Sequence, residues 1–222
     1  MTMTITRRTA VGQLAARAAL LPVAGSLLWP SRALATPTPF TDIGPFYPVA
    51  RPAEDDSDLT LIGTGKRAAG QVIEIVGRVL DGKGNGLARS RVEIWQANAA
   101  GKYAHAGDTS AVALDPRFQG FGAVTTDARG NYRFVTIMPG AYRIPPGAFG
   151  IAEGAIRPPH IHLDVSARND RLITQMLFPG DPLNDKDVVL ANVDRKLLIA
   201  ADRGAAASGA RRFEWNITLA NG

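Results

Sequence analysis

Short runs in which apolar and polar residues alternate dominate the chain from about residue 72 onward. Strand signals cover the ranges 72–80, 91–95, 160–166, 172–178 and 212–219. Glycine-rich turns such as 81–86 separate these runs, and the turn 127–130 joins two runs, 123–126 and 131–137, that read as a β-hairpin. Only 187–200 has a weakly helical pattern. The sequence therefore predicts an all-β chain, a β-sandwich of mostly antiparallel strands joined by long loops.

The first 35 residues have the pattern of an export signal. Arg7 and Arg8 precede a modest apolar stretch, 18–29, and a small-residue cleavage site ends at Ala35. The paired arginines resemble a twin-arginine signal, and an ordinary secretory signal is the alternative. The apolar stretch is too short to span a bilayer. We therefore expect an exported protein, periplasmic or extracellular, that is free of the membrane once residues 1–35 are removed.

Two further segments follow this signal. Residues 36–70 begin with a proline-rich stretch and are expected to form an extended arm that lies over the domain. Residues 71–222 contain all the strand signals and are expected to form one β-sandwich catalytic domain. The sequence shows no internal repeat and no second domain.

Charge and cysteine content remove several classes of function. The formal net charge is +5, but the export signal holds four arginines and no acidic residue, which leaves 21 Lys and Arg against 20 Asp and Glu. This near-neutral remainder gives little reason to expect a nucleic-acid partner. The chain has no cysteine, so disulfides, thiolate metal ligands and a cysteine nucleophile are excluded.

Two of the three histidines lie on one predicted strand, as His160 and His162. Residues two apart on a strand face the same side, so both imidazoles point one way and form half of a possible metal site. A purely structural pair is an equal alternative. Carboxylates such as Asp164, on the same strand face, could complete the site, and so could Tyr103 and Tyr142, which lie in loops or at strand ends.

Three classes of function stay open on this evidence. The first class is an enzyme that uses a hard trivalent metal ion, which tyrosine ligands would indicate. Carboxylate ligands would indicate a metal hydrolase or a cupin-like oxygenase that uses zinc or ferrous iron. The third class is a non-enzymatic sandwich that binds a carbohydrate or a partner protein.

Several segments between about residues 40 and 185 resemble the intradiol ring-cleavage dioxygenases, most closely the protocatechuate 3,4-dioxygenase beta-subunit type. They lie in the family's order at 41–47, 95–105, 114–118, 120–122, 139–142, 157–162 and 174–182. Each piece is short, but the combination is specific. The long helical dimerisation segment of catechol 1,2-dioxygenases has no counterpart in this sequence.

The resemblance implies a non-haem ferric ion, Fe(III), held by Tyr103, Tyr142, His160 and His162, with the loops of the sandwich forming the metal site. Two tyrosinates and one hydroxide would balance the three positive charges, which avoids burying net charge. A small aromatic diol and O2 would be the substrates. The ring would open between its two hydroxyl-bearing carbons to give a muconate-type diacid that contains both oxygen atoms of O2.

The resemblance also assigns roles to residues around the metal. Arg157 matches the family's catalytic arginine, Tyr142 the tyrosine that accepts a substrate proton, and Gln175 a glutamine near the substrate. His105 has no ligand role in the family pattern. Arg143 replaces a common proline, so charge alone makes it a candidate partner for a substrate carboxylate. Relatives of this type assemble as homo-oligomers or from unlike subunits.

Overall fold

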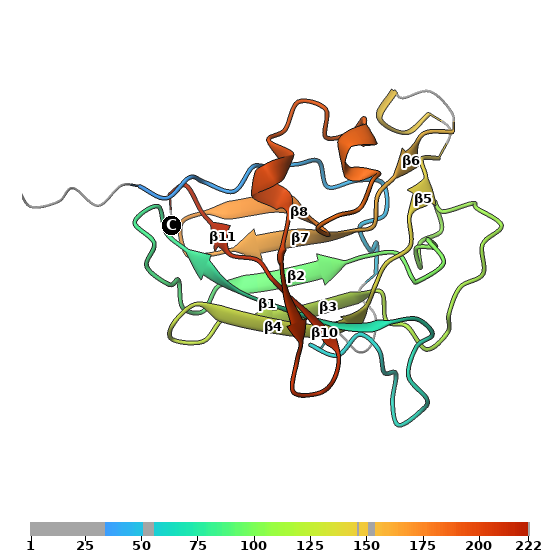
Figure 1. The fold of residues 1–222 in the computed structure, drawn as a ribbon, viewed down its shortest axis with the longest axis horizontal. Coiled ribbons are helices and arrows are strands. Elements are labelled where there is room, and N and C mark those ends of the chain that lie inside the picture. Colours follow the sequence, from blue (N-terminus) through green and yellow to red (C-terminus); the bar gives the residue numbers. More distant parts are fainter. Residues whose placement is uncertain (1–33, 51–55, 146, 151–153, 222) are drawn as a thin grey trace, which may run out of the picture. The chain divides into compact units, whose positions relative to one another are not determined.

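The computed structural model describes residues 34–50, 56–145, 147–150 and 154–221 (Figure 1). The predicted export signal, except for its last two residues, lies outside the described residues. Within them, no helix has the length and apolar character needed to cross a membrane.

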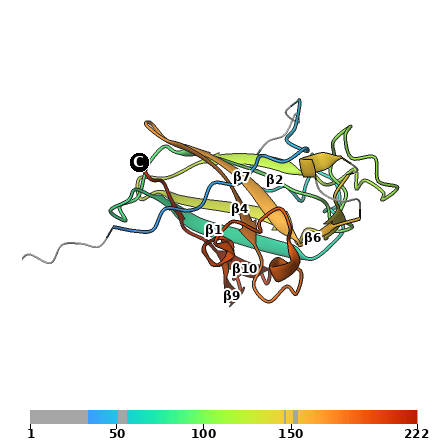
Figure 2. The same ribbon diagram turned by 90° about the horizontal axis from the view of Figure 1, so that it is seen from above.

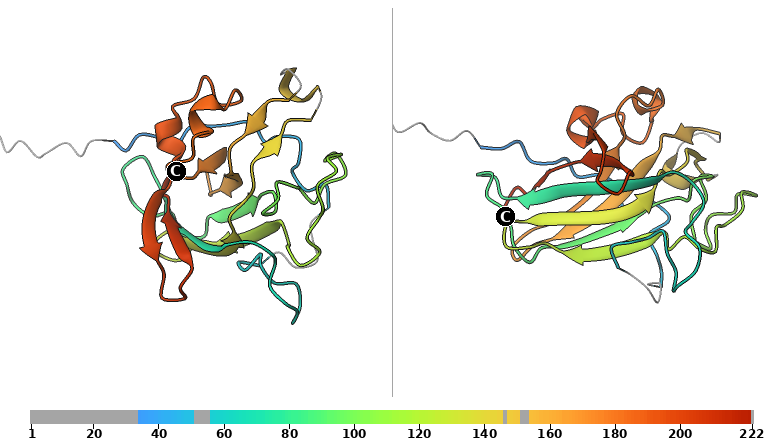
Figure 3. Two further views of the ribbon diagram at one scale, coloured as in Figure 1. Left: turned by 45° about the vertical axis from the view of Figure 1, so that its right-hand side comes forward. Right: turned by 60° about the horizontal axis from the view of Figure 1, so that its bottom comes forward.

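One sheet is built around β1, which pairs with strands from two distant parts of the chain. Its strands are β1 (Val72–Leu80), β4 (Asn131–Ile137), β9 (Ala201–Ala205), β10 (Arg211–Glu214) and β11 (Ile217–Thr218). Along one edge β1 pairs with β4 in antiparallel fashion, and along the other it pairs with β10 and β11 in parallel. The antiparallel β9–β10 pair, red in Figure 3, completes the sheet.

The second sheet has the order β3-β2-β7-β8 and is antiparallel throughout. Its strands are β2 (Arg91–Trp95), β3 (Phe121–Thr125), β7 (His160–Ser166) and β8 (Arg171–Leu177). Figure 2 shows β2 and β7 in one layer and β1 and β4 in the other. The predicted all-β sandwich of mostly antiparallel strands is confirmed, because each sheet presents alternate apolar side chains to the other.

The core between the sheets explains why these runs are strands. Ile73 and Ile75 of β1 and Ile161 and Leu163 of β7 belong to one buried cluster and are at most 1% exposed. Intervening residues of β7 therefore face away from this core, toward the other side of the sheet. A second buried cluster lies on that side and includes Phe46, Trp95, Tyr103, Phe121 and Tyr142.

The predicted hairpin of 123–126 and 131–137 is wrong. β3 pairs with β2 and β4 pairs with β1, so the turn between β3 and β4 carries the chain from one sheet to the other. The turn itself has the predicted chemistry: Asp127 Oδ1 accepts hydrogen bonds from the backbone N–H groups of Arg129 and Asn131, at 2.8 and 2.9 Å. Such a turn fits a hairpin and a crossing between sheets equally well.

The predicted helix at 187–200 is also largely wrong. Only η3 (Arg195–Leu198), a 3₁₀ helix, lies within it, and η2 (Asn184–Lys186) precedes it. Valines in this stretch favour helix weakly. A third short 3₁₀ helix, η1 (Ala148–Gly150), lies between β5 (Tyr142–Arg143) and β6 (Ile156–Arg157), two short strands that pair with each other just before β7.

Residues 34–50 have no regular secondary structure. Thr38 still bonds to Thr218 of the first sheet, and from Thr41 on the segment follows β8 at the edge of the second sheet. The N–H of Thr41 donates to the carbonyl of Ile173 on β8 at 2.9 Å, and Gln175 Nε2 donates to the carbonyl of Asp42 at 3.2 Å. The ring of Phe46 stacks on Tyr103 with a centroid distance of 4.6 Å. This segment therefore covers the face of the sheet that points away from the sandwich core.

Candidate active site

Both histidines of β7 face the side of the sheet that residues 34–50 cover. His160 and His162 are 2% and 1% exposed, while Ile161 between them points into the core. The Nε2 atoms of the two imidazoles lie 3.1 Å apart. The predicted common orientation of the two rings is therefore what the structure shows.

The two tyrosines predicted for the site come from separate loops and meet beside these histidines. Tyr103 lies in the loop after β2, and Tyr142 begins β5. Their ring centroids are 5.2 Å apart, and the rings are nearly perpendicular, at 85°. The Tyr103 hydroxyl lies 3.5 Å from Nε2 of His160, and the Tyr142 and His160 ring centroids are 5.6 Å apart. The structure thus brings all four predicted ligands together, and their metal ligation stays a prediction.

The imidazoles are neutral and one has a fixed tautomer. Burial, and next the positive charge of Arg157, hold the pKa of both His160 and His162 well below the ordinary value. Nδ1 of His160 lies 2.7 Å from the carbonyl oxygen of Pro158, which can only accept a hydrogen bond. The proton therefore sits on Nδ1, and the lone pair of Nε2 points into the site. Neutral imidazoles whose Nε2 lone pair faces the site are suited to bind a metal ion.

Both phenols are protonated as long as no cation takes the place of the proton. Burial, and next the charge of a neighbouring Tyr142 phenolate, raise the pKa of Tyr103 well above the ordinary value. Burial also raises the pKa of Tyr142, although Arg157 opposes the rise. The Tyr142 hydroxyl is buried, and no group in the described part of the chain meets hydrogen-bond geometry with it. A buried phenol oxygen without such a partner is what a metal ligand looks like before the metal binds.

The donor set fits ferric iron better than zinc or ferrous iron. Two phenol oxygens and two imidazole nitrogens converge, and phenolate is a hard donor that suits a hard trivalent cation. Within the described ranges, no group of three His, Cys, Asp or Glu residues could hold a metal. Asp164, the carboxylate of the competing hypothesis, binds Nη2 of Arg171 at 2.6 Å instead. The hydrolase and cupin-like alternatives are therefore not favoured.

Arg157 lies at the centre of a buried polar network beside the histidines. The side chain is 0% exposed, and its Nη1 lies 3.2 Å from Nε2 of His160. Its Nη2 donates to Oε1 of Gln175 at 2.6 Å and to Oδ2 of Asp187 at 2.8 Å. β5 and β6 pair so that Tyr142 lies opposite Arg157. The predicted catalytic residues are thus adjacent, with Gln175 holding the guanidinium.

Sequence reasoning missed Asp187, which is fully buried and forms an ion pair with Arg157. Its charge cancels that of the guanidinium, so the surroundings of the four ligands are neutral overall. This balance suits a trivalent ion with two tyrosinates and one further anion. The only local signal was an acidic residue before an apolar run, in a segment that was read as a helix.

Two other candidates lie away from this centre. His105 is partly exposed, and its Nδ1 accepts a hydrogen bond from the backbone of Gly107 at 2.9 Å. Arg143 is exposed and follows Tyr142 on β5, so it points to the opposite face of the strand pair. Its Nη1 donates to the carbonyl of Gly154 at 3.0 Å. Arg143 nevertheless lines the same cavity as Tyr142, so its pairing with a substrate carboxylate stays a prediction.

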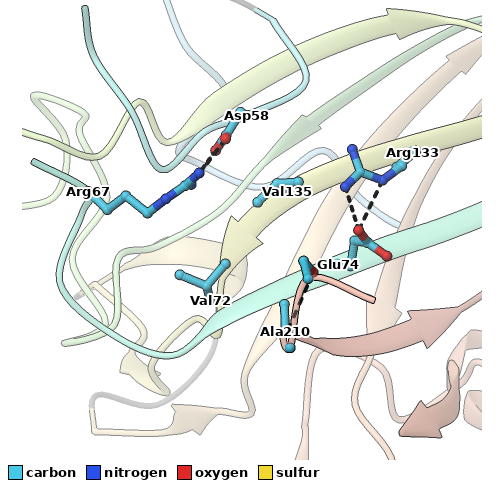
Figure 4. A pocket seen from close by; sticks show the side chains of 9 residues that line it. Asp58, Arg67, Val72, Glu74, Arg133, Val135 and Ala210 are labelled. Carbon is cyan, nitrogen blue, oxygen red and sulfur yellow. Dashed lines mark hydrogen bonds and ion pairs between the residues drawn. The ribbon is translucent and has the colours of Figure 1, made fainter. Parts of the chain in front are cut away.

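A cavity of about 570 Å³ lies on the outer face of the first sheet, over β1 and β4 (Figure 4). Arg67 and Arg133 line it, but each is already paired, with Asp58 and Glu74 respectively. None of the residues that surround the histidines lines this cavity. A cavity of about 210 Å³ does reach Tyr142. Volume alone therefore does not locate the chemistry, which lies where the phenols and imidazoles converge.

Comparison with known proteins places this chain in a family. The family described as Dioxygenase matches residues 43–221. This chain belongs to the intradiol ring-cleavage dioxygenase family. It is 49% identical over 116 residues to the protocatechuate 3,4-dioxygenase beta chain of Burkholderia cepacia, covering 51% of this chain and 47% of the relative. It is 33% identical over 188 residues to catechol 1,2-dioxygenase 2 of Acinetobacter lwoffii, covering 82% and 65%.

The fold agrees with a solved member of the family. The crystal structure of catechol 1,2-dioxygenase from Pseudomonas arvilla C-1 superposes with a TM-score of 0.63 and 29% identity, covering 85% of this chain and 63% of that chain. The chain thus spans less than two thirds of the length of these relatives.

Proposed function

We propose that this chain is an intradiol dioxygenase in which Tyr103, Tyr142, His160 and His162 hold a non-haem Fe(III). The reaction would convert a catechol-type diol and O2 into a muconate-type diacid. One carbon–carbon bond breaks between the hydroxyl-bearing carbons, and both atoms of O2 enter the product, so no further reductant is needed. The observation that carries this proposal is the convergence of two phenols and two neutral imidazoles in a buried site of balanced charge.

The protein residues have separable roles in this proposal. Bound ferric iron would supply Lewis acidity toward the diol oxygens. The phenolate of Tyr142 would accept a proton from a diol hydroxyl. Arg157 would stabilise negative charge that develops on the ring, held in place by Gln175 and Asp187. Burial by residues 34–50 would exclude bulk water from the reacting groups.

The visible absorption spectrum of the iron-loaded protein tests this proposal. Tyrosinate bound to Fe(III) should give a strong charge-transfer band, and excess catechol added without oxygen should shift it. Tyr103→Phe should weaken the band and abolish ring cleavage. Tyr132→Phe is the matched control, because Tyr132 is another buried tyrosine whose hydroxyl donates to the Trp215 carbonyl at 2.6 Å. A colourless protein with full iron occupancy would exclude tyrosine ligation and this reaction.

Substrate, assembly and location belong to the same proposal. The relatives are named for protocatechuate and catechol, so these two diols are the first to assay. One relative is a beta chain, which supports assembly with like or unlike subunits and can be tested by light scattering. Export is supported by Arg7, Arg8 and the apolar stretch that follows them. Recovery of the mature protein in the cytoplasmic fraction of its host would contradict export.

A further inference from the structure

One buried side chain organises the turn that leads into Tyr103. Asn98 is 5% exposed and lies three residues after the end of β2. Its Oδ1 accepts hydrogen bonds from the N–H groups of Ala100 and Lys102, at 2.9 and 3.0 Å. Its Nδ2 donates to the carbonyl of Ala113 at 3.0 Å, which ties the turn to the far end of the same loop. The three bonds of this one amide therefore fix the backbone on both sides of Tyr103.

The backbone of the same residue holds the loop that carries Tyr142. The carbonyl of Asn98 accepts hydrogen bonds from the N–H groups of Gly101 and Gly140, at 3.0 and 2.9 Å. Gly140 lies two residues before Tyr142. Asn98 thus contacts, through its side chain or its backbone, both loops that deliver a tyrosine to the site.

The two loops touch so closely that neither can shift alone. A Cβ atom at Gly140 would lie 2.5 Å from the backbone nitrogen of Gly101, and one at Gly101 would lie 2.2 Å from the carbonyl oxygen of Ala141. Gly101 also has a φ of +83°, which favours glycine. The loops therefore pack backbone against backbone, and a change in the turn at Asn98 must be passed to both tyrosines.

We infer that Asn98 is the positioning residue that fixes Tyr103 and Tyr142 relative to each other. The inference rests on the proposed function, since it gives the two tyrosines a shared metal. Asn98 touches neither hydroxyl, so it acts only through the backbone. Without its amide, the N–H of Lys102 loses its acceptor in a buried turn, and the turn relaxes to regain one. The resulting displacement reaches the phenols, whose separation a shared metal ion requires to be fixed.

Asn98→Ala tests the inference directly. A conservative variant and a structural control are compared with it. Asn98→Asp keeps the oxygen that accepts the two N–H groups, but it replaces the donor to Ala113 by a second carboxylate oxygen that the Ala113 carbonyl repels. Thr126→Ala is the structural control. Its hydroxyl is also buried, accepting from the N–H of Ser90 at 2.9 Å and donating to the carbonyl of Leu87 at 2.7 Å, but it touches neither tyrosine loop.

The test measures Fe(III) affinity and the tyrosinate charge-transfer band of each purified, folded protein, with thermal unfolding as the measure of stability. Replacing a residue that holds metal ligands in place typically lowers metal affinity about 10–100-fold. We expect a loss of this size and a shifted band for Asn98→Ala. Asn98→Asp should recover part of the affinity, because the acceptor of the Ala100 and Lys102 N–H groups is kept. Thr126→Ala should lower the Tm and leave the band unmoved. If Asn98→Ala does not fold, Asn98→Ser, which cannot reach both N–H groups, replaces it with the same expectation.

One result would overturn the inference about Asn98, and a different result would overturn the proposed function. Wild-type affinity and an unmoved band in Asn98→Ala or Asn98→Ser, together with a lowered Tm, would make Asn98 a purely structural residue and overturn the inference. A wild-type protein that binds no Fe(III), or binds it without colour, would instead overturn the proposed function.

Discussion

The ion pair between Arg157 and Asp187 is completely buried, so removing only its negative member should destabilise the protein strongly. Both side chains are 0% exposed, and Oδ2 lies 2.8 Å from Nη2. Asp187→Asn keeps the size of the side chain but leaves the guanidinium without a counter-charge. Breaking a buried pair in this way lowers the free energy of unfolding by about 3–5 kcal/mol. For a domain of this size the Tm should fall by roughly 6–20 °C.

Urea unfolding of the metal-free protein at pH 7, followed by circular dichroism, measures this loss. Asp164→Asn is the matched control, because Asp164 binds Arg171 at 2.6 Å but the arginine side chain is 60% exposed. Pairs of that kind contribute about 1 kcal/mol or less. Adding Arg157→Gln to Asp187→Asn should recover part of the loss, since no uncompensated charge remains. Equal losses for the two single variants would refute the reasoning that burial determines the size of the effect.

Two further predictions concern stability. Burial acts to raise the pKa of Glu74, but its two arginine partners hold the value below the ordinary 4.5. Because the folded-state pKa is the lower one, this stabilisation is complete above about pH 4.5 and is lost as pH falls through the folded-state pKa. Glu74→Gln should therefore reduce the free energy of unfolding more at pH 7 than at pH 3, and a pH-independent difference would contradict this. Gly140→Ala should reduce it by about 1–3 kcal/mol, because the new Cβ meets backbone atoms at 2.5 Å. Gly82→Ala, with its nearest atom at 3.7 Å, should lose less in the same urea titration, and an equal loss would exclude overpacking as the cause.

The fold class could be predicted from the sequence because a sandwich leaves a local signature. Alternation along 72–80 and 160–166 shows which side chains face the core, and the strands β1 and β7 coincide with these ranges. Strand partners leave no such signature. The turn at Asp127 has the same hydrogen bonds whether the next strand returns to its own sheet or crosses to the other. The hairpin prediction failed for that reason.

In the candidate site, too, one feature could be predicted from strand geometry and the others could not. The common face of His160 and His162 follows from strand geometry alone, and the structure shows it. The meeting of Tyr103 with Tyr142 depends on loops whose packing no periodic pattern reports, so only family resemblance pointed to it. Asp187 had neither kind of signal. Its role depends on an arginine 30 positions earlier, on β6, whereas Asp187 itself follows η2 in a loop.

The parallel pairing of β1 with β10 has a consequence for how the protein is made. Glu74 on β1 and its partner Arg212 on β10 are 138 residues apart. Synthesis proceeds from the amino end, so one edge of β1 stays open until β10 and β11 have been added. An open edge can pair with another chain, which makes the unfinished protein prone to association. Addition of β10 and β11, rather than assembly of the tyrosine and histidine site, is therefore the step that covers this edge of the sheet.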